Sequence, residues 1–122
     1  MTDDASRSTV FITNMASDHD YKSATVYGAL RPITTGNYPV FKSSRLLEEI
    51  AASLSQSEET DYLLFSGSSF IAGICLAVWL QRHKECRSLL YDKSQRGYAS
   101  RVIRKSDIII QLEKSRGKDD DE

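Results

Sequence analysis

A short polar stretch, Ser66-Gly67-Ser68-Ser69, contains the residues whose types and spacing come closest to forming a binding site. It joins the apolar run DYLLFS to the most hydrophobic segment of the chain, FIAGICLAVWL. If the first run is a strand and the second a helix, the N–H groups that begin the helix point outward from its positive end. Serine hydroxyls add donors and the glycine allows close approach, so the stretch suits a phosphate or a carboxylate.

The same residues also suit a purely structural role. A helix that follows a strand needs a capping residue, and Ser68 or Ser69 can provide it. The stretch has neither the GKS or GKT of a Walker A loop nor a GxGxxG fingerprint. The sequence therefore disfavours a nucleoside triphosphatase or a dinucleotide-dependent oxidoreductase, and leaves a helix cap and a ligand site as the two interpretations.

Asn14 and Asp92 each end a predicted strand, VFITN and CRSLLYD. Ligands of open α/β sheets bind outside the carboxyl ends of the strands. We therefore expect Asn14 to contact a ribose or nucleobase, and Asp92 to bind a ribose hydroxyl in preference to acting as a catalytic base, with the loop 34–37 closing over them. The alternative is that both residues only form turns. The predicted ligand-binding residues are Ser66, Gly67, Ser68, Ser69, Asn14 and Asp92.

The acidic–histidine cluster Asp18-His19-Asp20 has side chains that can bind a divalent metal. Adjacent residues in one loop rarely converge on one ion without partners elsewhere, so we predict no metal site. His83, the other histidine, ends a predicted helix and is expected to interact with the helix dipole.

The two cysteines, Cys75 and Cys86, have no CxxC spacing and lie in or beside the apolar run. This pattern predicts reduced, structural thiols. With both thiols buried and two histidines in the chain, neither a Cys–His nor a Ser–His–Asp arrangement can be assembled. The sequence therefore argues weakly against an enzyme, and it identifies no cofactor.

Residues 82–105 carry eight Lys or Arg against two acids, with Tyr91 and Tyr98 between them. A basic hairpin over 86–105 could follow a phosphate backbone. However, the sequence pI is near 6.1, and basic side chains at a sheet edge also prevent strand-to-strand aggregation. Nucleic-acid binding is therefore only the third functional hypothesis.

Hydrophobic periodicity predicts the elements that position these residues. A helix over 44–57 can be capped by Ser43 or Ser44, and a second helix over 69–83 is apolar nearly all round, which predicts that it is enclosed in the core. The predicted strands cover 10–14, 61–66, 86–92 and 98–103. Less regular segments are a helical turn near 21–27, one or two extended pieces over 30–41, and 107–112, for which an edge strand is preferred to a helical turn.

This order predicts an α/β sandwich of the Rossmann-like kind, with a largely parallel central sheet and a C-terminal antiparallel hairpin. We expect a flexible segment 1–8, one domain over 9–113 and a disordered acidic tail over 114–122. The predicted core is Ile12, Leu47, Ile50, Leu54, Leu64, Ile71, Ile74, Cys75, Val78, Leu89 and Leu90.

The N-terminus, MTDDASRSTV, lacks the basic start and apolar core of a signal peptide. The run FIAGICLAVWL is much shorter than the roughly 20 residues that a membrane helix needs. We therefore expect a soluble protein in the cytoplasm of a bacterial or phage-infected cell.

The segments VFITN, HDYKSATVYGALRPITTGNYPVFK, RLLEEI, DYLLFSGSS and LLYDKSQRGY together resemble a group of small phage-encoded and bacterial α/β proteins. The resemblance covers about residues 10–103. It implies a phage or prophage origin, and it brings no function and no catalytic or binding residues with it.

Two functional hypotheses lead. The first is a small binding module for a phosphorylated or nucleotide-like ligand at the Ser66–Ser69 loop. The second is an interaction protein that binds a host protein, which suits a small chain without a complete catalytic set. The sequence does not determine the oligomeric state.

Overall fold

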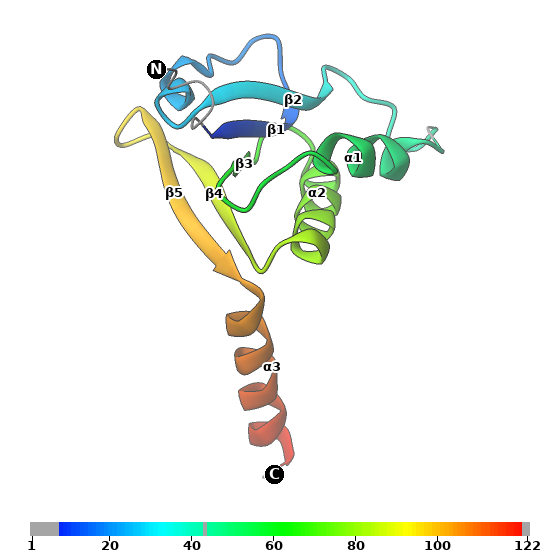
Figure 1. Ribbon diagram of the computed structural model, residues 1–122, viewed down its shortest axis with the longest axis vertical. Coiled ribbons are helices and arrows are strands. Elements are labelled where there is room, and N and C mark those ends of the chain that lie inside the picture. The colour runs from blue at the N-terminus through cyan, green and yellow to red at the C-terminus, as the bar shows by residue number, and fades with distance from the viewer. Residues whose placement is uncertain (1–7, 43, 121–122) are drawn as a thin grey trace.

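A five-stranded sheet organises residues 8–42 and 44–120, the part of the chain that the computed structural model describes (Figure 1). The strand order is β2-β1-β3-β4-β5. The first four strands run parallel, and β5 pairs antiparallel with β4. This arrangement confirms the predicted α/β class and the C-terminal hairpin. The strands are β1 (Thr9–Met15), β2 (Ala29–Thr35), β3 (Tyr62–Leu64), β4 (Glu85–Asp92) and β5 (Gly97–Arg104).

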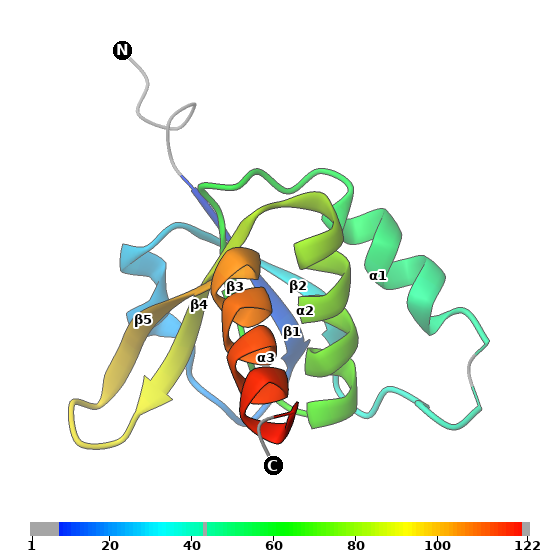
Figure 2. The same cartoon turned by 90° about the horizontal axis from the view of Figure 1, so that it is seen from below.

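Helices lie on both sides of this sheet (Figure 2). They are the 3₁₀ helix η2 (Lys22–Val26), α1 (Leu46–Leu54), α2 (Ser69–Arg82) and α3 (Lys105–Asp120). Helices α1 and α2 cover one face, and η2 packs on the other. The helical turn expected near 21–27 is thus present as η2. The extended segment over 30–41 supplies β2, an edge strand, which is where a strand containing Pro32 can be accommodated.

The start of α1 differs from our expectation. The residue at its N-cap is Arg45, whose side chain makes no capping hydrogen bond. Ser44 is therefore not the cap, and Ser43 lies outside the described residues. Glu48 and Glu49 do occupy the first turn, where the helix dipole favours acids.

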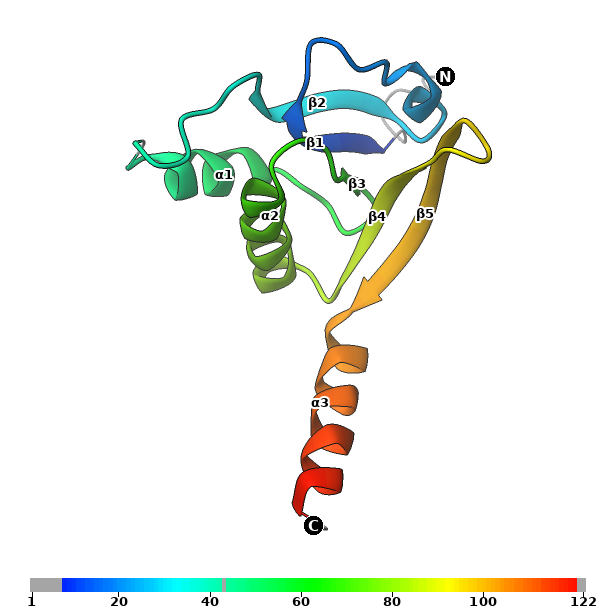
Figure 3. The ribbon, with the colours of Figure 1, turned by 180° about the vertical axis from the view of Figure 1, so that it is seen from behind.

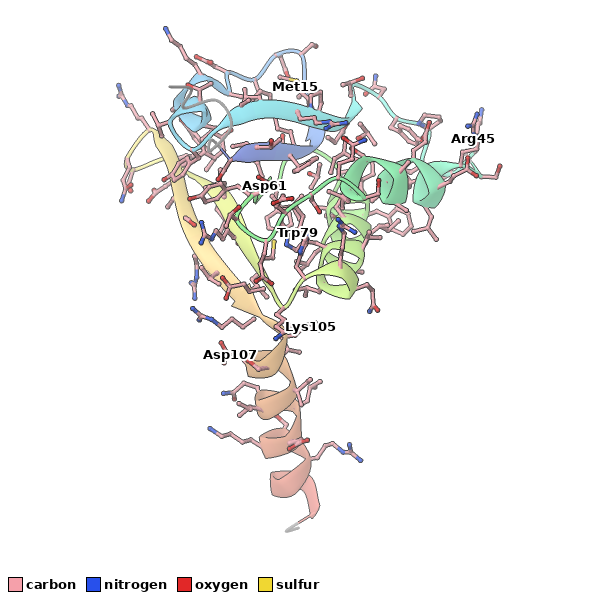
Figure 4. The ribbon with its side chains drawn as sticks, viewed as in Figure 1. Met15, Arg45, Asp61, Trp79, Lys105 and Asp107 are labelled. Atoms are coloured by element: carbon pink, nitrogen blue, oxygen red, sulfur yellow. The ribbon has the colours of Figure 1, made fainter. Side chains whose placement is uncertain are left out.

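The main core fills the space between the sheet and the two helices α1 and α2. Trp79 is its largest member and is fully buried. Its indole N–H donates to the carbonyl of Glu85 at 3.0 Å, and the Phe11 ring meets it edge-on with centroids 6.0 Å apart. Figure 4 labels Trp79 among the side chains. Sequence reasoning omitted Trp79 from the core, although it lies four residues after Cys75 and eight after Ile71, the spacing of one helix face.

Most of the predicted core residues are buried, but two are not. Leu47 is 60% exposed because α1 buries only one face, and its neighbour Leu46 occupies that face. Leu90 is 41% exposed although it shares a face of β4 with the buried Cys86 and Ser88, because it lies beyond the end of β3. Ile74 and Val78 are partly buried. The predicted residues that are fully buried are Ile12, Ile50, Leu54, Leu64, Ile71, Cys75 and Leu89.

Helix α2 is not enclosed on all sides, contrary to the prediction. Ile71, Cys75 and Trp79 form its buried face at i, i+4 and i+8. On the other side Phe70 is 59% exposed, and Gly73 is exposed as well. The cause is that α1 and α2 form a single layer on this face of the sheet, so α2 contacts the core on one side only.

The C-terminal segment differs most from the prediction. Residues 107–112 are not an edge strand but lie in α3, and residues 114–120, expected to be an unfolded tail, continue that helix. The helix projects away from the sheet (Figures 1 and 3). Three consecutive isoleucines favour a strand, but α3 begins directly after β5, with no turn that would return the chain to the open edge of β5, and a helix satisfies the backbone N–H groups locally. Residues 121–122, like residues 1–7 of the expected flexible N-terminus, lie outside the described residues.

Candidate functional site

A hollow of about 440 Å³ lies at the carboxyl ends of the parallel strands. Its walls come from the segments that follow β1, β2 and β3, so these strand ends converge as the sequence predicted. The loop 34–37, which was expected to close over this edge, contributes Gly36 and Asn37. The lining residues are Asn14, Ala16, Ser17, Asp18, Gly36, Asn37 and Gly67.

Gly67 is the residue on which the geometry of this edge depends. Its φ of +76° lies in the left-handed region. A Cβ atom at this position would lie 2.5 Å from Nδ2 and 2.8 Å from Cβ of Asn14. The backbone therefore turns from β3 towards α2 in direct contact with Asn14, and no side chain fits between them.

Asn14 is held in place from β2. The hydroxyl of Thr34 lies 2.8 Å from the carbonyl oxygen of Thr13 and 2.9 Å from Oδ1 of Asn14. Asn14 and Thr34 are both buried, so this contact fixes the side-chain amide. The amide group can donate and accept hydrogen bonds, and it forms one wall of the hollow.

Ser66 anchors the loop, because its side chain and its backbone are hydrogen-bonded to other residues of the fold. Its Oγ lies 2.7 Å from the hydroxyl of Tyr21, which also accepts the N–H of Ala16 at 2.8 Å. The backbone N–H and carbonyl of Ser66 both contact Oγ1 of Thr13, at 3.0 and 2.8 Å. Tyr21 was missed by sequence reasoning, because nothing in its local sequence distinguishes it from other tyrosines.

Ser68 is the N-cap of α2, as one of the two interpretations expected. Its Oγ accepts the N–H of Ile71 at 3.4 Å, and its carbonyl accepts the N–H of Ala72 at 3.0 Å. Ser69 begins the helix and is exposed. The four N–H groups from Gly67 to Phe70 have no hydrogen-bond acceptor within residues 8–42 and 44–120.

Asp92 lies at the carboxyl end of β4, as expected, but it does not line the hollow. Leu89 pairs with Leu64, the last residue of β3, so β4 continues three residues beyond the end of its neighbour. At that position Asp92 accepts hydrogen bonds from the N–H and the hydroxyl of Ser94, at 3.0 and 2.6 Å. These bonds lower the pKa of Asp92. The residue stabilises the hairpin turn, and it is not among the residues that line the hollow.

His19 belongs to an aromatic cluster beside the hollow. Its Nε2 lies 2.7 Å from the hydroxyl of Tyr98, and the rings of Tyr21 and Tyr91 meet it edge-on. Burial raises the pKa of Tyr98 to about 12, so its hydroxyl stays protonated. In the part of the chain that the structure describes, no three His, Cys, Asp or Glu side chains are grouped so as to hold a metal.

Ser57 and His83 meet at the far ends of α1 and α2. The buried Ser57 hydroxyl donates to the carbonyl of Leu54 at 2.6 Å and lies 2.8 Å from Nε2 of His83. Burial, together with the charge of Arg82, lowers the pKa of His83 and so favours the neutral imidazole. The expected role as a charged partner of the helix dipole is therefore not supported.

Cys75 and Cys86 are free and buried, as predicted. Burial raises the pKa of both thiols to about 12, so they remain protonated and unreactive at neutral pH.

The basic side chains of the hairpin do not form one strip. Arg101 and Arg104 point to opposite faces of β5, since they lie three positions apart along the strand. Arg104 is paired with Glu85, with Nε and Oε1 3.3 Å apart, and Arg96 occupies the turn with a φ of +52°.

Comparison with known proteins identifies the family of this chain. No curated protein and no solved structure is significantly similar to it. Among the described residues, no helix is long and apolar enough to cross a membrane. A model of the phage Pam3 gp32-like protein family matches residues 8–105, from the residue before β1 to the first residue of α3. The chain therefore belongs to the phage Pam3 gp32-like protein family.

Proposed function

We propose that this protein is a small binding module for a phosphorylated, nucleotide-like ligand, bound at the carboxyl edge of the sheet. One observation carries the proposal: the N–H groups of Gly67–Phe70, which have no acceptor among the described residues, lie at the start of α2, and Gly67 also lines a hollow formed by three strand ends. Such groups at the positive end of a helix bind anions. This is also the position at which Rossmann-like sheets bind ligands.

The lining of the hollow favours a ligand with hydroxyl groups as well as an anionic group. Asp18 lies in the wall and would repel a bare anion but would accept hydrogen bonds from a sugar. The amides of Asn14 and Asn37 can serve either a ribose or a base. A sugar phosphate or nucleotide therefore matches the site better than inorganic phosphate does.

Thermal unfolding in the presence of nucleotides, cyclic nucleotides and sugar phosphates tests the proposal. Binding to the folded state alone stabilises it by about 2.7 kcal/mol when the ligand is at a hundredfold excess over Kd. For a domain of this size, the midpoint should then rise by several degrees. If none of these compounds raises the midpoint, the proposed ligand class is wrong.

Two substitutions at one position test the contribution of the helix N–H groups. Proline is well tolerated as the first residue of a helix, so Ser69→Pro removes one N–H without breaking α2. Ser69→Ala removes the hydroxyl and keeps the N–H. We expect Ser69→Pro to abolish ligand stabilisation and Ser69→Ala to retain it. Equal binding by both variants would place the anion elsewhere.

Gly67→Val is unsuitable for this test. The added side chain would collide with Asn14 and strain the backbone, so a loss of binding would reflect a damaged fold. Asn37→Ala is a cleaner probe of the hollow because Asn37 is exposed. Ser55→Ala, on the exposed end of α1, serves as a remote control.

A second candidate function is that of an interaction protein that binds a protein of the host cell. Phe41 is 98% exposed and Leu47 is 60% exposed, on the segment that leads into α1 and on α1 itself. Exposed large apolar side chains of this kind mark protein-binding surfaces when they cluster. A pull-down with the parent and with a Phe41→Ser, Leu47→Ser double variant tests it, since a genuine partner must be lost with the double variant.

We further propose that the protein acts in the cytoplasm of a bacterial or phage-infected cell. Its family comes from phage, and its two free buried thiols suit a reducing compartment. Fractionation of expressing cells tests this location.

A further inference from the structure

The outer face of α2 is an apolar surface without a covering layer. From Ser69 to Gln81 the helix has no charged residue, although it lies at the surface. A shallow apolar groove runs along it, lined by Ser69, Phe70, Gly73, Ile74 and Ala77. A helix that is apolar all round is normally buried on all sides. The apolar character of this face therefore favours its burial against another apolar surface.

The projecting helix α3 has the complementary property. Four large apolar side chains on it are between 41% and 59% exposed. A single helix of 16 residues is marginally stable in water, because nucleation is costly and packing normally supplies the stability. Ile108 and Leu112 lie one turn apart on one side of α3, and they share that side with Gln111. The apolar residues are Ile108, Ile109, Ile110 and Leu112.

The same chain thus has an apolar groove along α2 and a second helix, α3, that is similar in length to α2 and packs against no other helix of the described chain. Helix α3 has 16 residues and α2 has 14, or about 24 and 21 Å at the usual rise per residue. We infer that a second copy of this chain covers the α2 groove: α3 of each protomer packs on α2 of its partner, in a reciprocal twofold dimer. Such an arrangement uses the same surfaces twice and closes on itself.

The charges at the helix ends favour an antiparallel pairing. Antiparallel packing brings the C-terminal end of α3, which includes Asp119 and Asp120, towards the positive N-terminal end of α2. At the other end, Asp107 in the first turn of α3 approaches the basic C-terminal turn of α2 with Arg82. Both ends thus bring opposite charges together.

The groove is not filled by α3 of the same chain. Helix α3 starts at Lys105 directly after the last residue of β5, and the N–H of Lys105 donates to the carbonyl of Lys84 at 3.0 Å. With no linker between strand and helix, α3 projects away from α2 and from the sheet (Figure 3; Lys105 is labelled in Figure 4). The partner's helix is free of this restriction. This inference does not rest on the proposed ligand site.

Sedimentation of the full chain over a range of concentrations tests the dimer. We expect the parent to dimerise, and we expect Ala77→Glu in the groove and Leu112→Glu on α3 each to weaken the dimer about a hundredfold or more, because each buries an unpaired carboxylate. Ile110→Glu is the matched control, since Ile110 lies on the opposite side of α3 from Leu112. All three positions are exposed, so circular dichroism should show an unchanged fold.

A mixing experiment separates reciprocal packing from other modes of association. Ala77→Glu protomers keep an intact α3, and Leu112→Glu protomers keep an intact groove. Mixed together, they should form a heterodimer with one native contact, detectable by native mass spectrometry, whereas each alone stays monomeric.

Three results would overturn the inference. If the parent protein is monomeric at all concentrations, a second copy of the chain does not occupy the groove. This conclusion holds even if the parent protein binds a different protein through α3. A dimer that Leu112→Glu disrupts but Ala77→Glu leaves intact would mean that α3 pairs with α3. A dimer that Ile110→Glu disrupts equally would mean that the assigned side of α3 is wrong.

Discussion

The carboxyl-edge hollow and α3 are opposite kinds of surface on one small domain. The hollow is formed by three segments held together by hydrogen bonds among Thr13, Asn14, Thr34 and Ser66. Helix α3 is formed by one continuous segment and joins the domain at Lys105. The described side chains from Ser106 to Gly117 are all exposed.

This difference determines what substitutions in each region report. A change near the hollow alters packing and hydrogen bonds inside the fold, so lost binding there must be separated from lost stability. A change on α3 leaves the fold intact, so its effects report directly on association. The predictions that follow compare matched residues from the two regions.

We expect the largest contrast from two leucines. Leu64 is fully buried next to the hollow, and Leu64→Ala should destabilise the fold by about 2–5 kcal/mol through lost contacts and a cavity. Leu112→Ala on α3 should change the free energy of unfolding by less than about 0.5 kcal/mol, since the residue is exposed. Urea unfolding at low protein concentration measures both. Similar losses would show that α3 packs against its own domain.

Two glycines give the next contrast. Gly67→Ala should cost about 1–3 kcal/mol, because φ is positive and the new Cβ meets Asn14. At Gly117, in α3, an added Cβ has no neighbour within 4 Å. Gly117→Ala should therefore leave the domain unchanged or stabilise α3 by about 0.5–1 kcal/mol. Denaturant midpoints and helical circular dichroism compare the two variants. A harmless Gly67→Ala would contradict the described contact.

Two tyrosine hydroxyls test the anchoring of the loop. Tyr21→Phe removes the hydroxyl that accepts from Ala16 and contacts Ser66, and we expect a loss of about 1–2 kcal/mol. Tyr91→Phe is the control, because the Tyr91 hydroxyl has no hydrogen bond to any described residue and the residue is 45% exposed. If both variants unfold alike, the Tyr21 hydroxyl does not hold the loop.

The smallest effect concerns pH. The pKa of His83 is lowered from its ordinary 6.5 by burial and by Arg82, so the unfolded chain takes up this proton at a higher pH than the folded protein does. The free energy of unfolding should therefore be unaffected above this value and should decrease as the pH falls below it. His83→Gln should flatten this decrease, as measured by urea unfolding between pH 7 and 5. An identical slope in the variant would assign the effect to other groups.

Local sequence pattern was sufficient to predict much of the fold. The strands β1, β4 and β5 and the helix α2 begin and end within two residues of their predicted bounds. Each has an uninterrupted apolar run or a regular apolar face, bounded by turn residues, and these signals act within a few residues. The sequence also predicted that Asn14 and Gly67 lie close together, because the carboxyl ends of parallel strands meet at one edge of the sheet.

What the sequence by itself determined is thus the class of fold, the main elements and the edge at which a site would lie, since each depends on local periodicity and on the geometry of parallel strands. Only the tertiary structure decided the rest. The three-residue β3 beside the longer β4 separates Asp92 from the hollow, and the Tyr21 hydroxyl engages Ser66. The isoleucines of α3 are helical because α3 begins directly after β5, with no turn that would return them to the open edge of that strand. These outcomes depend on which segments of the chain contact one another in the folded protein, and local sequence patterns do not specify those contacts.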